Sequence, residues 1–411
     1  MVISDSILQS GKVIENQSVN LLKAAQSMFE LLDSEATIAE QQFHLTNKSV
    51  EAMKKAGLYK MLVPKTIGGI EAEPCRILEV IEEISYAYGS AGWCLLNSVF
   101  HSAIVNIFAT KTVATEVLAN RDVVIAGQLP PKGIAIPEAD GYRLSGNYTF
   151  GSGISQADYL LCGAVISDRD SLDGNLSRDN LENRIFLVNR NAVRVDRDWQ
   201  VLGLRGTGSF NFSVSDLYVR ADYSFPIDLF NEYARKLYGT VYALENIGLS
   251  SLCLTGFALG IARRALHENA EIAKTKKTLH GLVGNSPTFQ EKFASAMVKL
   301  SAARSYCFEV WDSVTRDIIE NGNFLDVEQK TLLRLCLHHS YQVALEVCNF
   351  SYITSHRDAL RDCPLQRCYR DISSAIQHVS LSNEILQDCG KSLLKLYSPG
   401  SEWTMHGLDR F

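Results

Sequence analysis

The first hundred residues carry a helical spacing of hydrophobic positions. Between Asn16 and about Thr115, apolar side chains recur every three or four residues, for example at Ile77, Val80, Ile81 and Ile84. This period gathers the apolar side chains on one face of an amphipathic helix. The stretch Val63–Gly69 interrupts the pattern with a proline and a glycine pair, which is typical of a loop between helices. The pattern predicts a helical domain over residues 1–118.

Near Val123 the spacing changes to short β-branched and aromatic runs separated by turn residues. Five such runs are predicted as strands: Val123–Ala126, Tyr142–Ser145, Tyr159–Val165, Arg184–Val188 and Phe210–Val219. The polar piece Ser167–Asn183 is predicted as an exposed loop. Five short strands in about 100 residues predict a compact β sandwich or barrel over residues 119–228.

From about Tyr233 the helical spacing returns in long segments. Four helices of about 30 residues are predicted: Val241–Lys274, Pro287–Asn321, Val327–Ala359 and Pro364–Leu396. Helices of that length run about 45 Å and are expected to form a four-helix bundle over residues 229–411. Gly248, Gly256 and Gly260 cost stability in the first of these helices unless a close neighbour needs the room, and a contact between subunits is one explanation. The fold class is therefore mostly α with a β insert.

Composition and charge narrow the class of protein. Of 411 residues, 46% are hydrophobic and 21% charged, which is an ordinary globular balance that suggests two or three domains. A net charge of −6, with no basic block longer than Lys274–Lys277, argues against a nucleic-acid partner. The ten cysteines form no CxxC pair and are interpreted as buried thiols in a reducing cytosol. No signal peptide or membrane span is recognised, so we expect a cytoplasmic protein without a membrane partner.

Two glycine-rich turns flank the predicted strands. Gly203–Ser209 precedes a strand, whereas dinucleotide-binding and P-loop motifs precede a helix, so neither motif is assigned. A plain β-turn is the simplest interpretation, but the glycines also let the backbone approach a flat ligand, with the Thr207 and Ser209 hydroxyls beside it. Phe150–Gly153 lacks the spacing of a hydrolase nucleophile turn and is predicted as a hairpin turn.

The histidines do not form a metal-binding pattern. His338, His339 and His356 lie on long predicted helices without an HExxH motif, so no metal is predicted. His101 follows an apolar helix that contains Trp93, and His378 lies in the middle of the last predicted helix. Taken alone, each is typical of an ordinary core or surface histidine.

The order of a helical segment, a small β domain and a four-helix bundle resembles the acyl-CoA dehydrogenase fold along nearly the whole chain. The dehydrogenases usually carry a catalytic glutamate eight residues after the Arg-Asp pair of the last helix, whereas here Val379 follows Arg370 and Asp371 at that place, beside His378. Five stretches instead resemble the oxygenase components of two-component flavin-dependent monooxygenases: Pro64–Gly69, Gly89–His101, Gly146–Gly153, Trp199–Ser209 and Pro364–His378.

This resemblance implies an oxygenase that uses O2 and reduced FMN or FAD, which a separate flavin reductase supplies by diffusion. A C4a-hydroperoxyflavin would hydroxylate a small aromatic or heteroaromatic substrate or N-oxidise an amine. A homotetramer built through the helical bundle is also implied. The residues implied in flavin binding are Gln128, Phe150, Gly151, Ser152, Trp199, Thr207 and Arg370.

Three residues are implied in catalysis. The Ser152 hydroxyl would help to hold the hydroperoxide in a dry site. His378 and His101 are candidate bases with a pKa near 7, His378 being favoured for support of the flavin and His101 for deprotonation of the substrate.

Two alternatives stay open at the level of the sequence. An acyl-CoA dehydrogenase or oxidase would use Glu268 or Glu271, on the first bundle helix, as its base. A non-catalytic protein with a flavoprotein fold would act as a structural partner.

Overall fold

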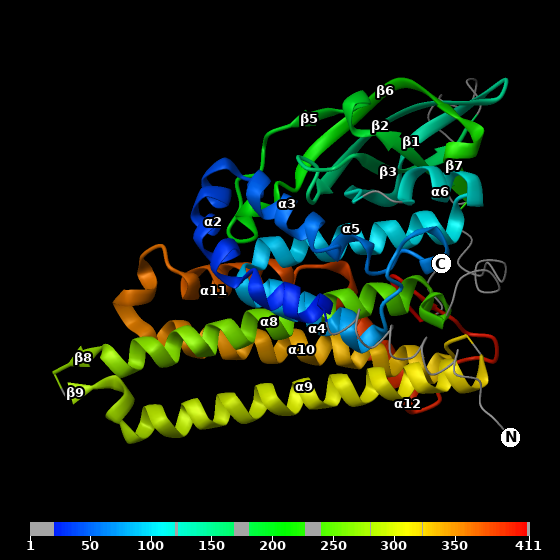
Figure 1. Cartoon of the computed structure of the whole chain (residues 1–411). Helices are drawn as coiled ribbons and strands as arrows, with labels where there is room; N and C mark the ends of the chain where they lie inside the picture. Colours follow the sequence, from blue (N-terminus) through cyan, green and yellow to red (C-terminus); the bar gives the residue numbers. More distant parts are fainter. Residues whose placement is uncertain are drawn as a thin grey trace, which may run out of the picture.

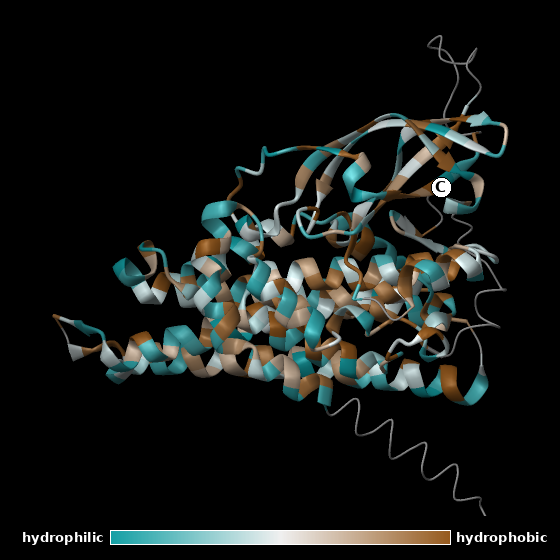
Figure 2. Cartoon of the chain, turned by 45° about the horizontal axis from the view of Figure 1, so that its top comes forward, coloured by the Kyte–Doolittle hydropathy of each residue, from teal (hydrophilic) through white to brown (hydrophobic). Residues whose placement is uncertain are grey.

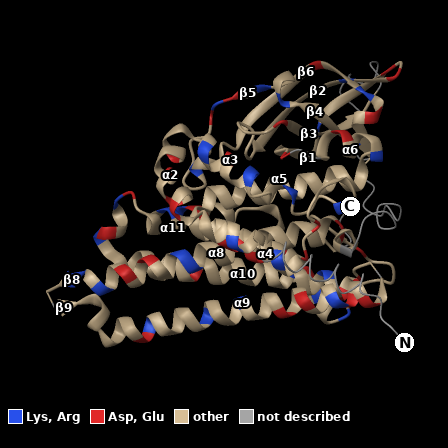
Figure 3. Cartoon of the chain, in the orientation of Figure 1, with Lys and Arg blue, Asp and Glu red and all other residues tan. Residues whose placement is uncertain are grey.

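The computed structural model describes residues 20–119, 122–167, 181–226, 240–279, 281–322 and 324–408. The predicted loop at Ser167–Asn183 lies mostly outside the described residues. The sheet lies on one side of the molecule, helix α5 runs beneath it, and the long helices lie below α5 (Figure 1). Hydrophilic and hydrophobic residues alternate along the bundle helices (Figure 2), and acidic and basic residues are interspersed over the helical and β parts (Figure 3).

The N-terminal part is helical, as predicted. Its α-helices are α2 (Phe29–Gln42), α3 (Asn47–Lys55), α4 (Pro74–Ala87), α5 (Gly89–Phe108) and α6 (Lys111–Leu118). The threonines before α3 and α6, Thr46 and Thr110, cap these helices by accepting hydrogen bonds from backbone N–H groups. Helix α5 is buried along most of its length, which makes it the central support of the candidate site described below.

The β domain is one seven-stranded sheet with the order β5-β6-β2-β1-β3-β4-β7. Its strands are β1 (Ile125–Glu138), β2 (Gly141–Gly151), β3 (Tyr159–Ile166), β4 (Asn183–Asn189), β5 (Arg194–Asp196), β6 (Phe210–Arg220) and β7 (Ser224–Pro226). The β1–β3 pair is parallel and the other pairs are antiparallel.

All five predicted strands are present, but the predicted end of the first strand, at Ala126, is wrong. Strand β1 continues to Glu138. Pro130 and Pro131 do not end it, since they fall between Gln128 and Gly133, where the register with β3 shifts. A proline is tolerated at such an irregularity because no ladder hydrogen bond is required of it there. The three-residue strands β5 and β7 lie at the two edges of the sheet and carry too short a pattern to be recognised.

The C-terminal part contains three of the four predicted long helices: α8 (Glu245–Thr275), α9 (Pro287–Asn321) and α10 (Val327–Ser355). The fourth prediction, one helix over Pro364–Leu396, is wrong. The segment folds as α11 (Pro364–Ala375), a 3-10 turn (Val379–Leu381) and α12 (Asn383–Leu393). At the break, Nδ1 of His378 accepts a hydrogen bond from the Ser380 backbone N–H at 3.2 Å. A side chain that bonds to nearby backbone in this way competes with the helical hydrogen-bond ladder.

The glycines of α8 allow a close contact inside this chain. A Cβ atom at Gly256 would lie 2.7 Å from the Leu78 carbonyl oxygen, and one at Gly260 would lie 2.3 Å from the Glu82 carbonyl oxygen. Both carbonyls belong to α4, so the backbone of α4 lies directly against the glycines of α8. The close helix contact expected from these two glycines is therefore present, and it lies within one chain.

Among the residues that the structure describes, two helical segments meet the length and hydropathy of a membrane span: Gly89–Phe108 and Val241–Thr275. The fold buries 83% and 94% of their most apolar windows. Buried core helices pass the same test, so these segments are accounted for by the interior of the fold.

Candidate functional site

Two glycine-containing turns from distant parts of the chain meet above α5. The turn Phe150–Gly153 ends β2, and a 3-10 turn at Arg205–Thr207 precedes β6. They are joined by a hydrogen bond of 2.9 Å from the Gly153 N–H to the Thr207 carbonyl. Phe150 has a φ of 58° and Leu204 a φ of 56°. Left-handed backbone at non-glycine residues is costly and concentrates at functional sites.

A chain of side-chain hydrogen bonds connects these turns to α5. Trp93 Nε1 donates to Ser152 Oγ at 3.2 Å, and Ser152 Oγ lies 2.7 Å from Ser209 Oγ. Ser209 Oγ lies 2.7 Å from Thr207 Oγ1, which donates to the Leu204 carbonyl at 2.8 Å. We call the three hydroxyls of Ser152, Ser209 and Thr207 the hydroxyl relay.

The relay has one direction because a carbonyl oxygen can only accept. The Thr207 hydroxyl donates its proton in the hydrogen bond to the Leu204 carbonyl and can therefore only accept from Ser209. Ser209 in turn accepts from Ser152. Ser152 already accepts from Trp93, so its oxygen keeps one further lone pair. This lone pair can accept an N–H from a ligand, whereas the Ser152 proton is already committed.

The second turn is fixed to α11. The Leu204 N–H donates to Asp371 Oδ1 at 2.6 Å, and the Gly203 N–H donates to Ser374 Oγ at 3.0 Å. A Cβ atom at Gly203 would lie 2.0 Å from the Arg370 carbonyl oxygen, so only glycine fits this contact. The glycine-rich loop therefore lets the β domain dock on the bundle, and it also places the carbonyl that ends the relay.

Arg370 helps to hold the same junction. It is buried, and its Nη2 lies 2.9 and 3.1 Å from the two carboxylate oxygens of Glu40 on α2. Its Nη1 donates to the Leu202 carbonyl at 3.2 Å. The guanidinium is thus matched to Glu40, and flavin binding by Arg370 stays a prediction. Thr207 is likewise fully buried, and its role toward a ligand runs through Ser209 and Ser152.

Ser152 and His378 both lie next to Trp93. The Trp93 and His378 ring centroids are 6.1 Å apart in an edge-on arrangement. Because His378 Nδ1 accepts the Ser380 N–H, the neutral ring carries its proton on Nε2. Burial, followed by the positive charge of Arg334, lowers the pKa of His378 to about 4. His378 is therefore a hydrogen-bond donor at neutral pH, and its pKa is well below the expected value near 7.

His101 lies two turns further along α5 than Trp93. Its Nδ1 lies 3.3 Å from the Ile125 carbonyl, to which it donates, so Nε2 of the neutral ring is an acceptor. Burial lowers the pKa of His101 to about 4. Eight residues along a helix correspond to a rise of about 12 Å. The structure thus brings Ser152 and His378 to Trp93 and places His101 further along the same helix.

The remaining residues predicted to contact flavin lie in or next to the turn Phe150–Gly153. Phe150 is 63% exposed and lies edge-on to Trp199, with ring centroids 6.0 Å apart. Gln128 is bonded in both directions to Thr149, at 3.1 and 3.2 Å, and Gly151 is buried beside Phe212. An exposed aromatic side chain on strained backbone is suited to contact a flat ligand.

Sequence reasoning missed two residues that organise the site. Trp93 is recognised only as part of a matching stretch, and Asp371 only as part of an Arg-Asp pair. Trp93 lies eight residues before His101, a spacing of about two helical turns, which was a usable signal. Asp371 had no such signal, because its partner Leu204 is distant in sequence.

These residues fit a flavin. The isoalloxazine is flat and carries N–H groups and carbonyl oxygens, which match the exposed Phe150 ring, the free lone pair of Ser152 and the N–H donor of His378. The dehydrogenase alternative has less support. Glu268 accepts from Arg264 Nε at 2.8 Å, and Glu271 is an exposed residue whose pKa is lowered by its hydrogen bond with Lys274.

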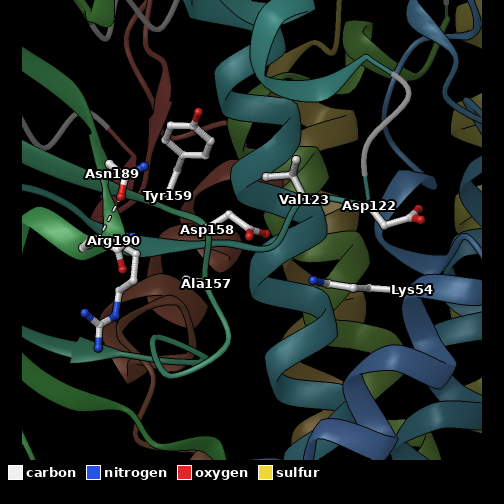
Figure 4. A pocket seen from close by; sticks show the side chains of 9 residues that line it. Lys54, Asp122, Val123, Ala157, Asp158, Tyr159, Asn189 and Arg190 are labelled. Carbon is white, nitrogen blue, oxygen red and sulfur yellow. Dashed lines mark hydrogen bonds between the residues drawn. The ribbon is translucent and has the colours of Figure 1, made fainter.

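A separate polar recess of about 380 Å³ opens between α3 and the starts of β1 and β3 (Figure 4). Its walls include Lys54, Asp122 and Asp158, and the Asp158 carboxylate accepts the Val124 N–H at 2.9 Å. None of the predicted site residues lines it. Asp158 therefore anchors the start of β1 beside the recess.

Acid is expected to weaken the fold through the site histidines. Their pKa values fall from 6.5 to about 4 on folding, so between these pH values the unfolded chain binds two protons that the folded chain does not. Burial, with Glu40 next, raises the pKa of Asp371 from 3.8 to about 7, which opposes the effect by one proton. The net loss is roughly 1.4 kcal/mol per pH unit below 6.5 from these three groups.

Urea unfolding of the wild type and of His101→Gln at pH 4.5 and 6.5 measures this. Glutamine does not titrate, so the unfolded His101→Gln chain binds one proton fewer than the unfolded wild type. The free energy of unfolding of this variant should therefore depend less on pH, by roughly 1.4 kcal/mol per pH unit. Equal pH dependence of the two proteins would contradict the assignment.

Comparison with known proteins adds to this geometry. Residues 252–383 match the family model "Acyl-CoA dehydrogenase, C-terminal domain". Indole-3-acetate monooxygenase of Pseudomonas putida is 28% identical over 85% of this chain and 87% of its own length. The oxygenase component of the FADH2-dependent resorcinol hydroxylase of Rhizobium sp. (strain MTP-10005) is 23% identical over 93% of this chain and 96% of its own length.

Among solved structures, XiaF from Streptomyces sp., in complex with FADH2 and glycerol, has a TM-score of 0.85 and 19% identity, with 96% of this chain and 98% of that chain covered. This likeness confirms the predicted architecture. The chain has the acyl-CoA dehydrogenase fold and is similar along most of its length to oxygenase components of flavin-dependent monooxygenases.

Proposed function

We propose that this oxygenase hydroxylates a small aromatic or heteroaromatic compound beside Trp93, and that a separate reductase supplies its reduced flavin. The hydroxyl relay is the main observation that supports the proposal. Its direction leaves an acceptor lone pair on Ser152 Oγ, next to the Trp93 indole that also contacts His378. The names of the Pseudomonas and Rhizobium relatives, which refer to indole-3-acetate and resorcinol, support an aromatic substrate.

Each residue has a role that follows from its protons. Bound reduced flavin supplies the electrons with which O2 is activated. Ser152 Oγ accepts an N–H, and His378 Nε2 donates a hydrogen bond to an oxygen atom beside Trp93. His101 Nε2 accepts the O–H or ring N–H of the substrate. Trp93 and Phe257, whose rings meet edge-on at 5.1 Å, keep water from this side.

Association of several copies through the bundle is also proposed. Four leucines of α12 and the residues just after it support this, because they are exposed in the single chain: Leu386, Leu393, Leu394 and Leu396.

Mixing the protein with photoreduced FMN or FAD, air and either indole-3-acetate or resorcinol tests the proposed reaction. We expect about one hydroxylated product for each reduced flavin, and hydrogen peroxide when the aromatic compound is left out. Anaerobic addition of acyl-CoA to the protein with oxidised flavin is the control for the dehydrogenase alternative. Bleaching of the flavin by acyl-CoA, with no hydroxylated product from any aromatic compound, would contradict the proposal.

A further inference from the structure

Arg334 on α10 is a buried cation without a matching anion. Its side chain is 1% exposed, and its Nη2 donates to the Thr404 carbonyl at 2.9 Å. Its Nε has no hydrogen-bond partner, and within the described ranges no carboxylate lies within 4.0 Å of the guanidinium. Burial lowers the pKa of Arg334 to about 10. The guanidinium lies over the Trp403 ring, 5.8 Å from its centroid, and this contact does not replace an anion for a desolvated charge.

Two further polar groups on the same face of α10 also lack partners. His338 and Tyr341 follow Arg334 by four and seven residues, a spacing that places all three on one stripe of the helix. His338 is 6% exposed and Tyr341 is fully buried, and neither His338 Nε2 nor Tyr341 Oη has a hydrogen-bond partner among the described residues. Buried polar atoms are almost always paired, so three orphans on one stripe point to a missing ligand group.

This stripe lies behind the candidate site. Tyr341 stacks on Phe257 with ring centroids 6.2 Å apart, and Phe257 contacts Trp93. At the other end, Arg334 is close enough to His378 for its charge to lower the pKa of that histidine. Trp93 is therefore linked to the stripe through Phe257, which contacts both Trp93 and Tyr341, and through His378, which lies beside Trp93 and is influenced by the charge of Arg334.

The charge available at the stripe is a single positive one. Lys330, a buried cation one turn before Arg334 on α10, is paired with Glu245 at 2.7 Å. One uncompensated guanidinium suits a monoanion, and its planar fork matches the two oxygens of a carboxylate. A doubly charged phosphate would leave negative charge uncompensated in the same place.

We propose that the substrate is an aromatic carboxylic acid and that Arg334 binds its carboxylate, with His338 and Tyr341 as further hydrogen-bonding groups. This inference rests on the proposed function, since it takes the ring of the substrate to lie at Trp93. It makes Arg334 a specificity-determining residue that holds the end of the substrate remote from the reacting carbon.

Calorimetric binding of acid and amide pairs to the full-length protein with reduced flavin, under anaerobic conditions, tests the proposal. The pairs are indole-3-acetate with indole-3-acetamide, 4-hydroxyphenylacetate with its amide, and benzoate with benzamide. We expect the wild type to bind at least one acid roughly 10- to 150-fold more tightly than its amide, as for a hydrogen bond to a charged group. Arg334→Met should lose this preference while it binds the amide as before.

Lys330→Met is the matched control, because it removes a buried cation one turn away that is already paired, and the preference for the acid should persist. Arg334→Lys keeps the charge without the fork and should show a reduced preference, which also provides the test if Arg334→Met does not fold. Equal binding of acid and amide by the wild type in every pair would overturn the proposal. So would an equal loss of both ligands in Arg334→Met, or a loss confined to reduced flavin.

Failure of the proposed function would look different. In that case the wild type would form no hydroxylated product from either member of any pair, whatever their affinities. A wild type that hydroxylates the amides and acids equally well, with equal affinity, would keep the function and remove only the carboxylate site.

Discussion

Ser152→Ala is expected to turn the protein from a hydroxylase into a producer of hydrogen peroxide. The substitution removes the acceptor that the relay orients, together with the hydrogen bond that Ser152 accepts from Trp93 Nε1. Loss of one hydrogen bond to a reacting group is worth about 1.5–3 kcal/mol, so product formed per reduced flavin should fall by about 10-fold or more. Reduced flavin should still be consumed, and the missing product should appear as peroxide.

The measurement is the ratio of hydroxylated product to hydrogen peroxide at a fixed amount of photoreduced flavin. Ser155→Ala is the matched control, since Ser155 is an exposed serine of the same connection between β2 and β3. That variant should retain the wild-type ratio. A Ser152→Ala protein with the full yield of product would show that the relay does not act on the reaction.

The sequence predicts the architecture well because long periodic segments dominate it. Helices α8, α9 and α10 carry enough turns for the apolar stripe to be recognised, and their burial follows from it. The failures occur where one local interaction overrides the pattern. At the break before Val379, His378 Nδ1 accepts a hydrogen bond from the Ser380 backbone N–H. Strand β1 contains two prolines at an irregularity that only the pairing with β3 shows.

The sequence predicts which residues form the candidate site better than it predicts their protonation and the direction of their hydrogen bonds. Ser152 and His378 are recognised by resemblance, and both lie beside Trp93. Their protonation depends on burial and on partners that are distant in sequence, so a pKa near 7 for His378 is the natural sequence-based value and about 4 is the value in the fold. The direction of the relay likewise depends on the Leu204 carbonyl, whose position is set by Asp371 on α11.

Gly203→Ala is expected to separate the β domain from the bundle at the site. The new Cβ would meet the Arg370 carbonyl oxygen at 2.0 Å, and neither backbone can yield without breaking the hydrogen bonds from Gly203 to Ser374 and from Leu204 to Asp371. Overpacking and the lost bond to a carboxylate together cost about 3–5 kcal/mol. Flavin affinity should fall with stability, because the Leu204 carbonyl that orders the relay moves away.

Gly390→Ala provides the contrast that makes this result specific. Gly390 lies inside α12, and a Cβ atom there would meet nothing within 4 Å. Alanine in a helix is favoured over glycine by roughly 0.5–1 kcal/mol, so this variant should be slightly more stable and bind flavin normally. Denaturant unfolding and flavin titration of the two variants are compared with the wild type. Since both changes add the same methyl group, opposite effects can arise only from what surrounds each glycine, and a stable, flavin-binding Gly203→Ala protein would mean that the loop does not dock on α11.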